Sequence, residues 1–119
     1  MASNLTTAAL SLKSGFNSLF INSSGIVCDG KCVDTPHTAV HSSFYALAFG
    51  LLDDTHVSTV ATYIRDRITT GPLGMPCGPY TSQFLITALY MDTIDHGMSA
   101  YDVITSSAMH SWSSMMQVC

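Results

Sequence analysis

Apolar residues recur at helical spacing along most of the chain, and their pattern predicts five helices. A stripe that repeats every three or four residues is typical of a helix that buries one face against other protein. The expected helices cover about residues 4–20, about 36–50, the segment between the cap 53–55 and the breaker 71–79, and about 81–95 and 100–116. We therefore expect an all-α fold of antiparallel helical hairpins joined by short loops.

The second expected helix differs from the others because two of its faces are apolar. Thr35 and Pro36 predict its start, as N-cap and first helical residue. Its two stripes are Val40, Phe44, Leu47 and Leu51, and Tyr45, Phe49 and Leu52. The third helix has a single stripe, which is Val57, Val60, Ala61, Ile64 and Ile68. We therefore expect protein all around the second helix and solvent on one side of the third.

The last two helices follow a segment rich in glycine and proline, residues 71–79, which excludes helix and favours an ordered loop. Gly97 is expected to end the fourth helix, and Ser99 with Asp102 resembles a capping box for the fifth. The main core is expected between the second and fourth helices. Its expected members are Phe44, Leu47, Leu51, Phe84 and Leu89.

The segment between the first two helices, residues 26–33, is expected to form a β-hairpin around the turn Asp29-Gly30. If the turn is a three-residue hairpin loop, Cys28 and Cys32 face each other and form a candidate disulfide. Two reduced, inert thiols are the alternative, because disulfides are rare in the cytosol. The other two cysteines have no apparent partner, and no Cys-x-x-Cys pair indicates a zinc ribbon or a thioredoxin-like site.

The composition indicates a chain that buries much of its surface against more protein. Of the 119 residues, 47% are hydrophobic and only 10% are charged, against about 25% charged in an ordinary domain. We therefore expect self-association through apolar faces. The basic residues form no patch and the net charge is −4, which argues against binding to nucleic acid. No apolar run approaches the roughly 20 residues of a membrane span, and no secretory signal is visible.

Few side chains stand out as candidates for chemistry. His37 and His41 are four residues apart, a spacing that places both on one face of a helix. Such a pair can bind a metal ion, and Asp34 is the candidate for a third ligand. Ordinary histidines near a helix start are the alternative, and the glutamate of the His-Glu-x-x-His motif is missing. A lone histidine pair at this spacing is common on helices, so no metal is expected.

Cys77 is a candidate nucleophile, but a cysteine nucleophile needs a histidine base and none lies nearby in the sequence. An ordinary loop thiol is the alternative. No phosphate-binding glycine motif occurs, and no cofactor is expected.

Four blocks of sequence, in order and at matching spacing, resemble a known family. They are 37–51 (His-Thr-Ala-Val-His-Ser-Ser-Phe-Tyr-Ala-Leu-Ala-Phe-Gly-Leu), 75–80 (Met-Pro-Cys-Gly-Pro-Tyr), 84–90 (Phe-Leu-Ile-Thr-Ala-Leu-Tyr) and 112–116 (Trp-Ser-Ser-Met-Met). From Leu5 to Met116 the chain resembles part of the six-hairpin (α,α) barrel of glycoside hydrolase family 78, the α-L-rhamnosidases, especially its fungal members. The resemblance implies a slice of an inverting glycosidase that acts on carbohydrate, in a family whose members are often secreted.

The resemblance also implies that neither catalytic residue of such a barrel lies on this chain. In the family a glutamate base follows the Trp-x-x-Met block after a short gap, and the general acid precedes the matched region. The eight acidic residues here are all aspartates, so the sequence contains no glutamate. Glycoside hydrolysis normally uses two carboxyl groups. We therefore expect the chain to be inactive alone. The alternative is that it is a weak enzyme that uses the loop aspartates Asp29 or Asp34.

In such a barrel the substrate lies at the N-terminal ends of the inner helices, which here would be the second and the fourth. The resemblance thus implies that Asp34, His37 and Tyr80 line the substrate cleft of a complete barrel. Caps and turns are the alternative roles for these residues. A non-catalytic helical module for interaction or oligomerisation is the alternative function of the chain.

Overall fold

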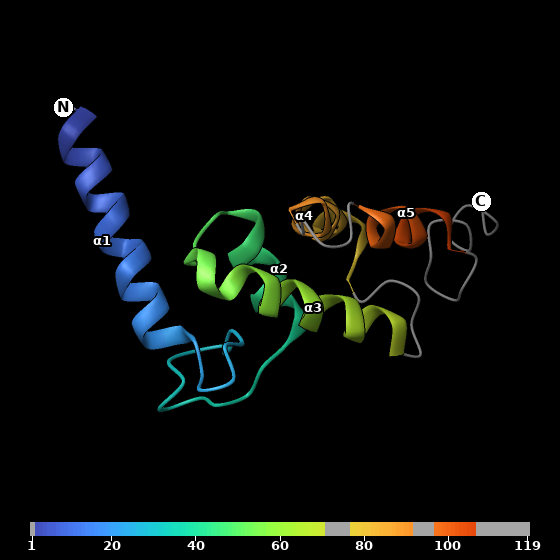
Figure 1. Cartoon of the computed structure of the whole chain (residues 1–119), viewed down its shortest axis with the longest axis horizontal. Coiled ribbons are helices and arrows are strands. Elements are labelled where there is room, and N and C mark those ends of the chain that lie inside the picture. Colours follow the sequence, from blue (N-terminus) through green and yellow to red (C-terminus); the bar gives the residue numbers. More distant parts are fainter. Residues whose placement is uncertain (1, 71–76, 92–96, 107–119) are drawn as a thin grey trace.

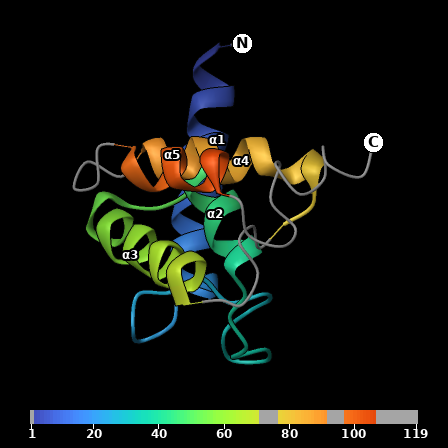
Figure 2. The same ribbon diagram turned by 90° about the vertical axis from the view of Figure 1, so that its right-hand side faces the viewer.

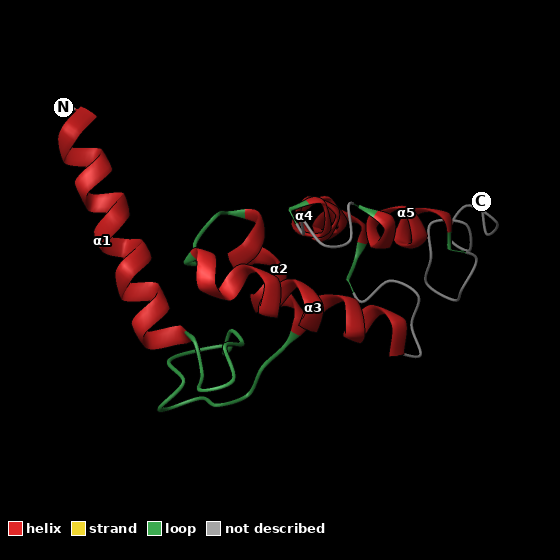
Figure 3. Cartoon of the chain, in the orientation of Figure 1, coloured by secondary structure: helices red, strands yellow, loops and turns green. Residues whose placement is uncertain are grey.

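The chain folds into helices connected by loops and turns (Figures 1 and 3). A computed structural model describes residues 2–70, 77–91 and 97–106. Its helices are α1 (Ala2–Phe20), α2 (Val40–Ala48), α3 (Asp54–Thr70), α4 (Pro79–Tyr90) and α5 (Met98–Thr105). Within these residues, β-type pairing is limited to an isolated bridge between Ile21 and Val27. The predicted all-α fold class is confirmed.

Helix α2 lies at the centre of the packed helices. It packs against both α3 and α4, and α4 in turn packs against α5. The hairpin of α2 and α3 is joined by residues 49–53, and α4, viewed end-on in Figure 1, lies across this pair (Figures 1 and 2). The largest buried side chains are Phe44, Leu47, Ile64, Leu85 and Leu89. They come from α2, α3 and α4, so the core lies where these three helices meet.

The residues expected to form the core do so. Phe44, Leu47 and Leu89 are buried, and Leu51 and Phe84 are half-buried against the same cluster. On α3, the buried residues Val60, Ala61 and Ile64 all belong to the single predicted stripe.

The second apolar face of α2 is covered only in part. The ring of Tyr45 lies 5.3 Å from that of Phe84 on α4, and the ring of Phe49 is equally close to Phe84. Phe49 nevertheless keeps 60% of its surface exposed. Protein therefore surrounds α2 less completely than the two stripes predicted.

Helix α1 projects away from the packed helices (Figures 1 and 2). Leu5 and Leu12 keep 72% and 73% of their surface exposed. The C-terminal end of α1 is anchored through Asn17, whose Nδ2 donates to Leu51 O at 2.7 Å and whose Oδ1 accepts the Asp53 N–H at 2.9 Å. One side chain thus joins α1 to the connection between α2 and α3. None of the described helices has the length and hydropathy of a membrane span.

The predicted start of α2 is wrong. The helix begins at Val40 rather than at Pro36. The backbone just before Val40 is held in a non-helical position by residue 29, because the Asp29 N–H donates to His37 O at 3.0 Å. The predicted hairpin over residues 26–33 is also wrong. Val27 pairs with Ile21 instead of with a strand after the turn.

The predicted caps of the last two helices are displaced as well. Helix α4 ends at Tyr90, and Gly97 is the residue before α5, with φ +80°. This left-handed backbone is one that glycine adopts without strain. Ser99 lies inside α5, so it is not the first residue of a capping box. The remaining parts of the two expected helices, residues 92–96 and 107–116, lie outside the described residues.

Candidate functional site

Asp29 lies at the centre of a polar network in front of α2. Its Oδ1 accepts hydrogen bonds from the Ala39 N–H at 3.1 Å and from the Ser42 hydroxyl at 3.0 Å. Its Oδ2 accepts a hydrogen bond from His37 Nδ1 at 2.5 Å. Ala39 is the N-cap residue of α2 and has no capping side chain of its own. The carboxylate therefore caps α2 from a separate segment, where a negative charge is favourable.

These contacts lower the pKa of Asp29 below its ordinary value of 3.8. The hydrogen bond from His37 is the main cause, and those from Ser42 and Ala39 act in the same direction. A glycosidase acid needs a carboxyl group whose pKa is raised, so that it remains protonated near neutral pH. The shift of Asp29 is in the opposite direction, which favours the capping interpretation of this aspartate over the catalytic one.

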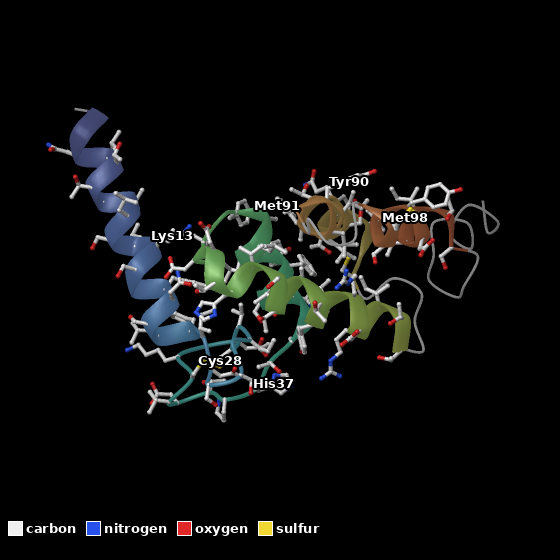
Figure 4. The ribbon with its side chains drawn as sticks, in the orientation of Figure 1. Lys13, Cys28, His37, Tyr90, Met91 and Met98 are labelled. Atoms are coloured by element: carbon white, nitrogen blue, oxygen red, sulfur yellow. A yellow bond between two sulfur atoms is a disulfide. The ribbon has the colours of Figure 1, made fainter. Side chains whose placement is uncertain are left out.

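Cys28 and Cys32 are joined by a disulfide, with their Cα atoms 5.4 Å apart. The Cys28 N–H donates to Phe20 O and the Cys32 N–H donates to Leu19 O, both at 2.9 Å. These carbonyls belong to the last turn of α1, where a helix leaves its own acceptors without partners. The disulfide ring 28–32 therefore caps the end of α1, while Asp29 within it caps the start of α2. Figure 4 shows Cys28 and His37 in this loop region, below the lower end of α1.

The prediction that His37 and His41 share a helical face is wrong. Since α2 begins at Val40, only His41 lies in the helix. His37 is bound to Asp29, and the ring of His41 lies 5.3 Å from that of Phe44. Across the ranges that the structure describes, no group of three or more histidine, cysteine or acidic side chains is arranged to hold a metal ion.

The structure places the three expected substrate-lining residues on two separate elements. Asp34 and His37 are exposed in the loop before α2, where the Asp34 N–H donates to Lys31 O in a turn. Tyr80 lies in the first turn of α4 and is 92% exposed. It borders a shallow pocket of about 360 Å³, whose described lining residues are Pro79, Tyr80, Ser82, Gln83 and Ile86.

Cys77, the other candidate for chemistry, is half-buried just before α4 and packs against the core. Burial raises the pKa of its thiol, and a hydrogen bond with Thr81 opposes this shift. A thiol with a raised pKa is mostly protonated at neutral pH and is a poor nucleophile. Packing is therefore the role that the structure supports for Cys77.

Two residues that position the site were not anticipated from the sequence. Asn17 bonds to partners 34 and 36 positions away, and Ser42 bonds to Asp29 across 13 positions. No local spacing signals contacts of this length. The sequence feature that distinguishes Asn17 is only that this polar residue directly follows the apolar Phe16.

The helices and their packing define the class of this protein. Helices packed as hairpins, with no sheet in the part of the chain that the structure describes, are typical of an α-hairpin domain. The family model of the bacterial alpha-L-rhamnosidase 6 hairpin glycosidase domain matches residues 2–118. The chain belongs to this family. No curated protein and no solved structure matches the chain.

The family match confirms the family predicted from the four sequence blocks, while the fungal assignment stays a prediction. Six hairpins require twelve helices, and the described residues form five. The chain therefore corresponds to part of a rhamnosidase-type six-hairpin domain.

Proposed function

We propose that the chain forms part of the helical wall of an α-L-rhamnosidase-type glycoside hydrolase domain and has no glycosidase activity by itself. The observation that carries this proposal is the family match over residues 2–118. The central position of α2 and its hairpin with α3 are consistent with it, since a ring of hairpins buries inner helices between outer ones.

The lack of activity is proposed from the carboxyl groups. The sequence contains no glutamate, and Asp29 is engaged as a cap with a lowered pKa. None of the described residues that line the pocket beside Tyr80 carries a carboxylate. Since glycoside hydrolysis needs a protonated and an ionised carboxyl on either side of the bond, the purified chain should not turn over an aryl α-L-rhamnoside. Turnover that Asp29→Asn or Asp34→Asn abolishes would contradict this proposal.

A chimera tests the family role separately from the lack of activity. In an active bacterial rhamnosidase with this domain, the segment aligned to residues 2–118 is replaced by this chain, so that the catalytic glutamates come from the host. We expect a folded chimera that hydrolyses the aryl rhamnoside. A matched chimera with Leu47→Asp places a charge in the core and should fail to fold. If both chimeras were equally unfolded, the proposed role would be wrong.

Within a complete domain, we propose that Asp34, His37 and Tyr80 face the carbohydrate. The support is the exposed ring of Tyr80 beside a pocket that also contains Gln83, since ligand sites combine aromatic surface with a few polar groups. In the chimera, Tyr80→Ala should raise KM with little change in the thermal midpoint. Tyr101→Ala, which removes an exposed ring on α5, is the control. Equal KM values for the two variants would refute this placement.

The exposed face of α1 favours a second candidate function, a helical module that associates with copies of itself. Beside α1 lies an apolar groove of about 450 Å³, lined by Ser11, Leu12, Gly15, Phe16, Leu19, Phe20 and Leu51. Exposed apolar surface of this kind is typical of association sites. Light scattering at micromolar concentration should show assemblies that Leu12→Gln reduces. A monodisperse monomer before and after the substitution would exclude this candidate.

A further inference from the structure

The disulfide ring 28–32 makes contacts that hold two helices at once. The N–H groups of Cys28 and Cys32 donate to the last carbonyls of α1. Inside the ring, the Asp29 carboxylate accepts the Ala39 N–H at the start of α2, and the Asp29 N–H donates to His37 O. All of these contacts are made by residues 28–32, which the Cys28–Cys32 disulfide closes into a ring.

We propose that the Cys28–Cys32 disulfide is a redox-sensitive clamp. The disulfide fixes the end of α1 and the start of α2, and a dithiol releases both by reducing it. A closed ring has few conformations, so its N–H groups and carboxylate stay aligned with both helices at little entropic cost. When the bond is reduced, residues 28–32 regain that freedom and both caps weaken. The position of His37 then changes with them, because the ring holds His37 through both its backbone and its imidazole.

Reduction should begin at the more accessible sulfur. Cys28 is 2% exposed, whereas Cys32 is only half-buried. A thiolate of the dithiol attacks Cys32 Sγ, and Cys28 Sγ leaves as a thiolate that takes up a proton. The second thiol of the reductant then displaces Cys32 Sγ, which is protonated in turn. Two electrons are transferred, and the products are two cysteine thiols and the oxidised, disulfide form of the reductant.

Amide hydrogen exchange of the whole chain tests the clamp, with and without dithiothreitol. Cys77→Ser and Cys119→Ser are introduced in all samples so that no other thiol can exchange with the ring. Far-UV circular dichroism, recorded in parallel, verifies that the helices persist in both conditions.

The amides of Cys28, Cys32 and Ala39 should exchange about ten- to thirtyfold faster after reduction, the range that the chain entropy of so short a ring allows. The amides of Ile64 and Leu89, in the core outside the clamp, should not change. If the three clamp amides were equally protected in both conditions, the proposal would be wrong. An equal acceleration of Ile64 and Leu89 would also overturn it, because the disulfide would then support the whole core.

Two variants separate the ring from the caps that it forms. The double variant Cys28→Ser/Cys32→Ser should exchange like the reduced chain whether or not dithiothreitol is present. Asp29→Asn keeps the disulfide, so it should accelerate the amide of Ala39 while positions 28 and 32 stay protected. A double variant that still responds to dithiothreitol would assign the response to another part of the chain and contradict the clamp.

Discussion

Asp29 gives the stability of the chain a dependence on pH. Its pKa is lowered in the folded state, chiefly by the hydrogen bond from His37, so protonation of this carboxyl favours unfolding. The stabilisation is complete above the unfolded pKa, near 3.8, and is lost as the pH falls through the lower folded pKa. Asp29→Asn should therefore lower the urea midpoint at pH 6, and the difference from the parent chain should shrink below pH 4.

Asp34→Asn is the matched control for this effect, because that carboxylate is exposed in the same loop and lies outside the network around Asp29. Its substitution should leave the midpoint unchanged at both pH values. A deficit of Asp29→Asn that is as large at pH 3 as at pH 6 would show that the ionised carboxylate contributes nothing through its hydrogen bonds.

Glycine is required at position 97 for two reasons: the backbone has a left-handed conformation, and the Tyr90 ring occupies the space that a side chain would need. The φ of Gly97 is +80°, and a Cβ built there would lie 2.6 Å from Tyr90 Cε1. Gly97→Ala should therefore destabilise the fold by more than about 1 kcal/mol. Gly78→Ala is the control, since Gly78 has φ −71° and open space around it. Urea denaturation compares the two variants, and equal midpoints would refute the argument.

At the scale of elements, α2 makes most of the contacts between the described helices. Leu47 is buried where α2 meets its neighbours, so Leu47→Ala should cost about 2–5 kcal/mol. The same change at Leu10, which is 64% exposed on α1, should cost less than about 0.5 kcal/mol. Chemical denaturation of both variants measures the difference. A small effect at Leu47 would mean that the core is not centred on α2.

The helices themselves could be predicted from the sequence, because each one that packs in the core carries an apolar stripe with the period of a helix. Their ends could not. The start of α2 depends on the Asp29 carboxylate, which comes from ten positions earlier. Thr35 and Pro36, a valid local signal for a helix start, lie in the loop that this contact holds. A long-range hydrogen bond therefore overrode the local preference.

For the whole molecule, the stability should depend little on the outer part of α1. Residues 4–10 are all exposed, so deletion of residues 2–9 should change the unfolding free energy by about 0.5 kcal/mol or less. Asn17→Ala removes both hydrogen bonds to the connection between α2 and α3 and should cost about 1–3 kcal/mol. A deletion as costly as Asn17→Ala would show that the outer turns pack on something in solution.

The sequence indicates single candidate residues for the site, and it does not indicate how they are arranged in space. The resemblance to the family indicates Asp34, His37 and Tyr80, and the structure places them on a loop and on the first turn of α4. The pairing of His37 with Asp29 depends on how the chain folds back after α1. Spacing along the sequence contains no information on that path, so the spacing of His37 and His41 predicts a helical pair that the structure does not form.

The projection of α1 also makes the amino terminus a convenient point of attachment. The helix has 19 residues and rises about 1.5 Å for each, so its first residue stands about 28 Å from the end that is fixed. A fluorophore or a surface tether joined there would be separated from the core by a stiff spacer. The orientation of the tethered molecule would then be set by the contacts of Asn17 and of the ring 28–32 with the end of α1, rather than by a flexible linker.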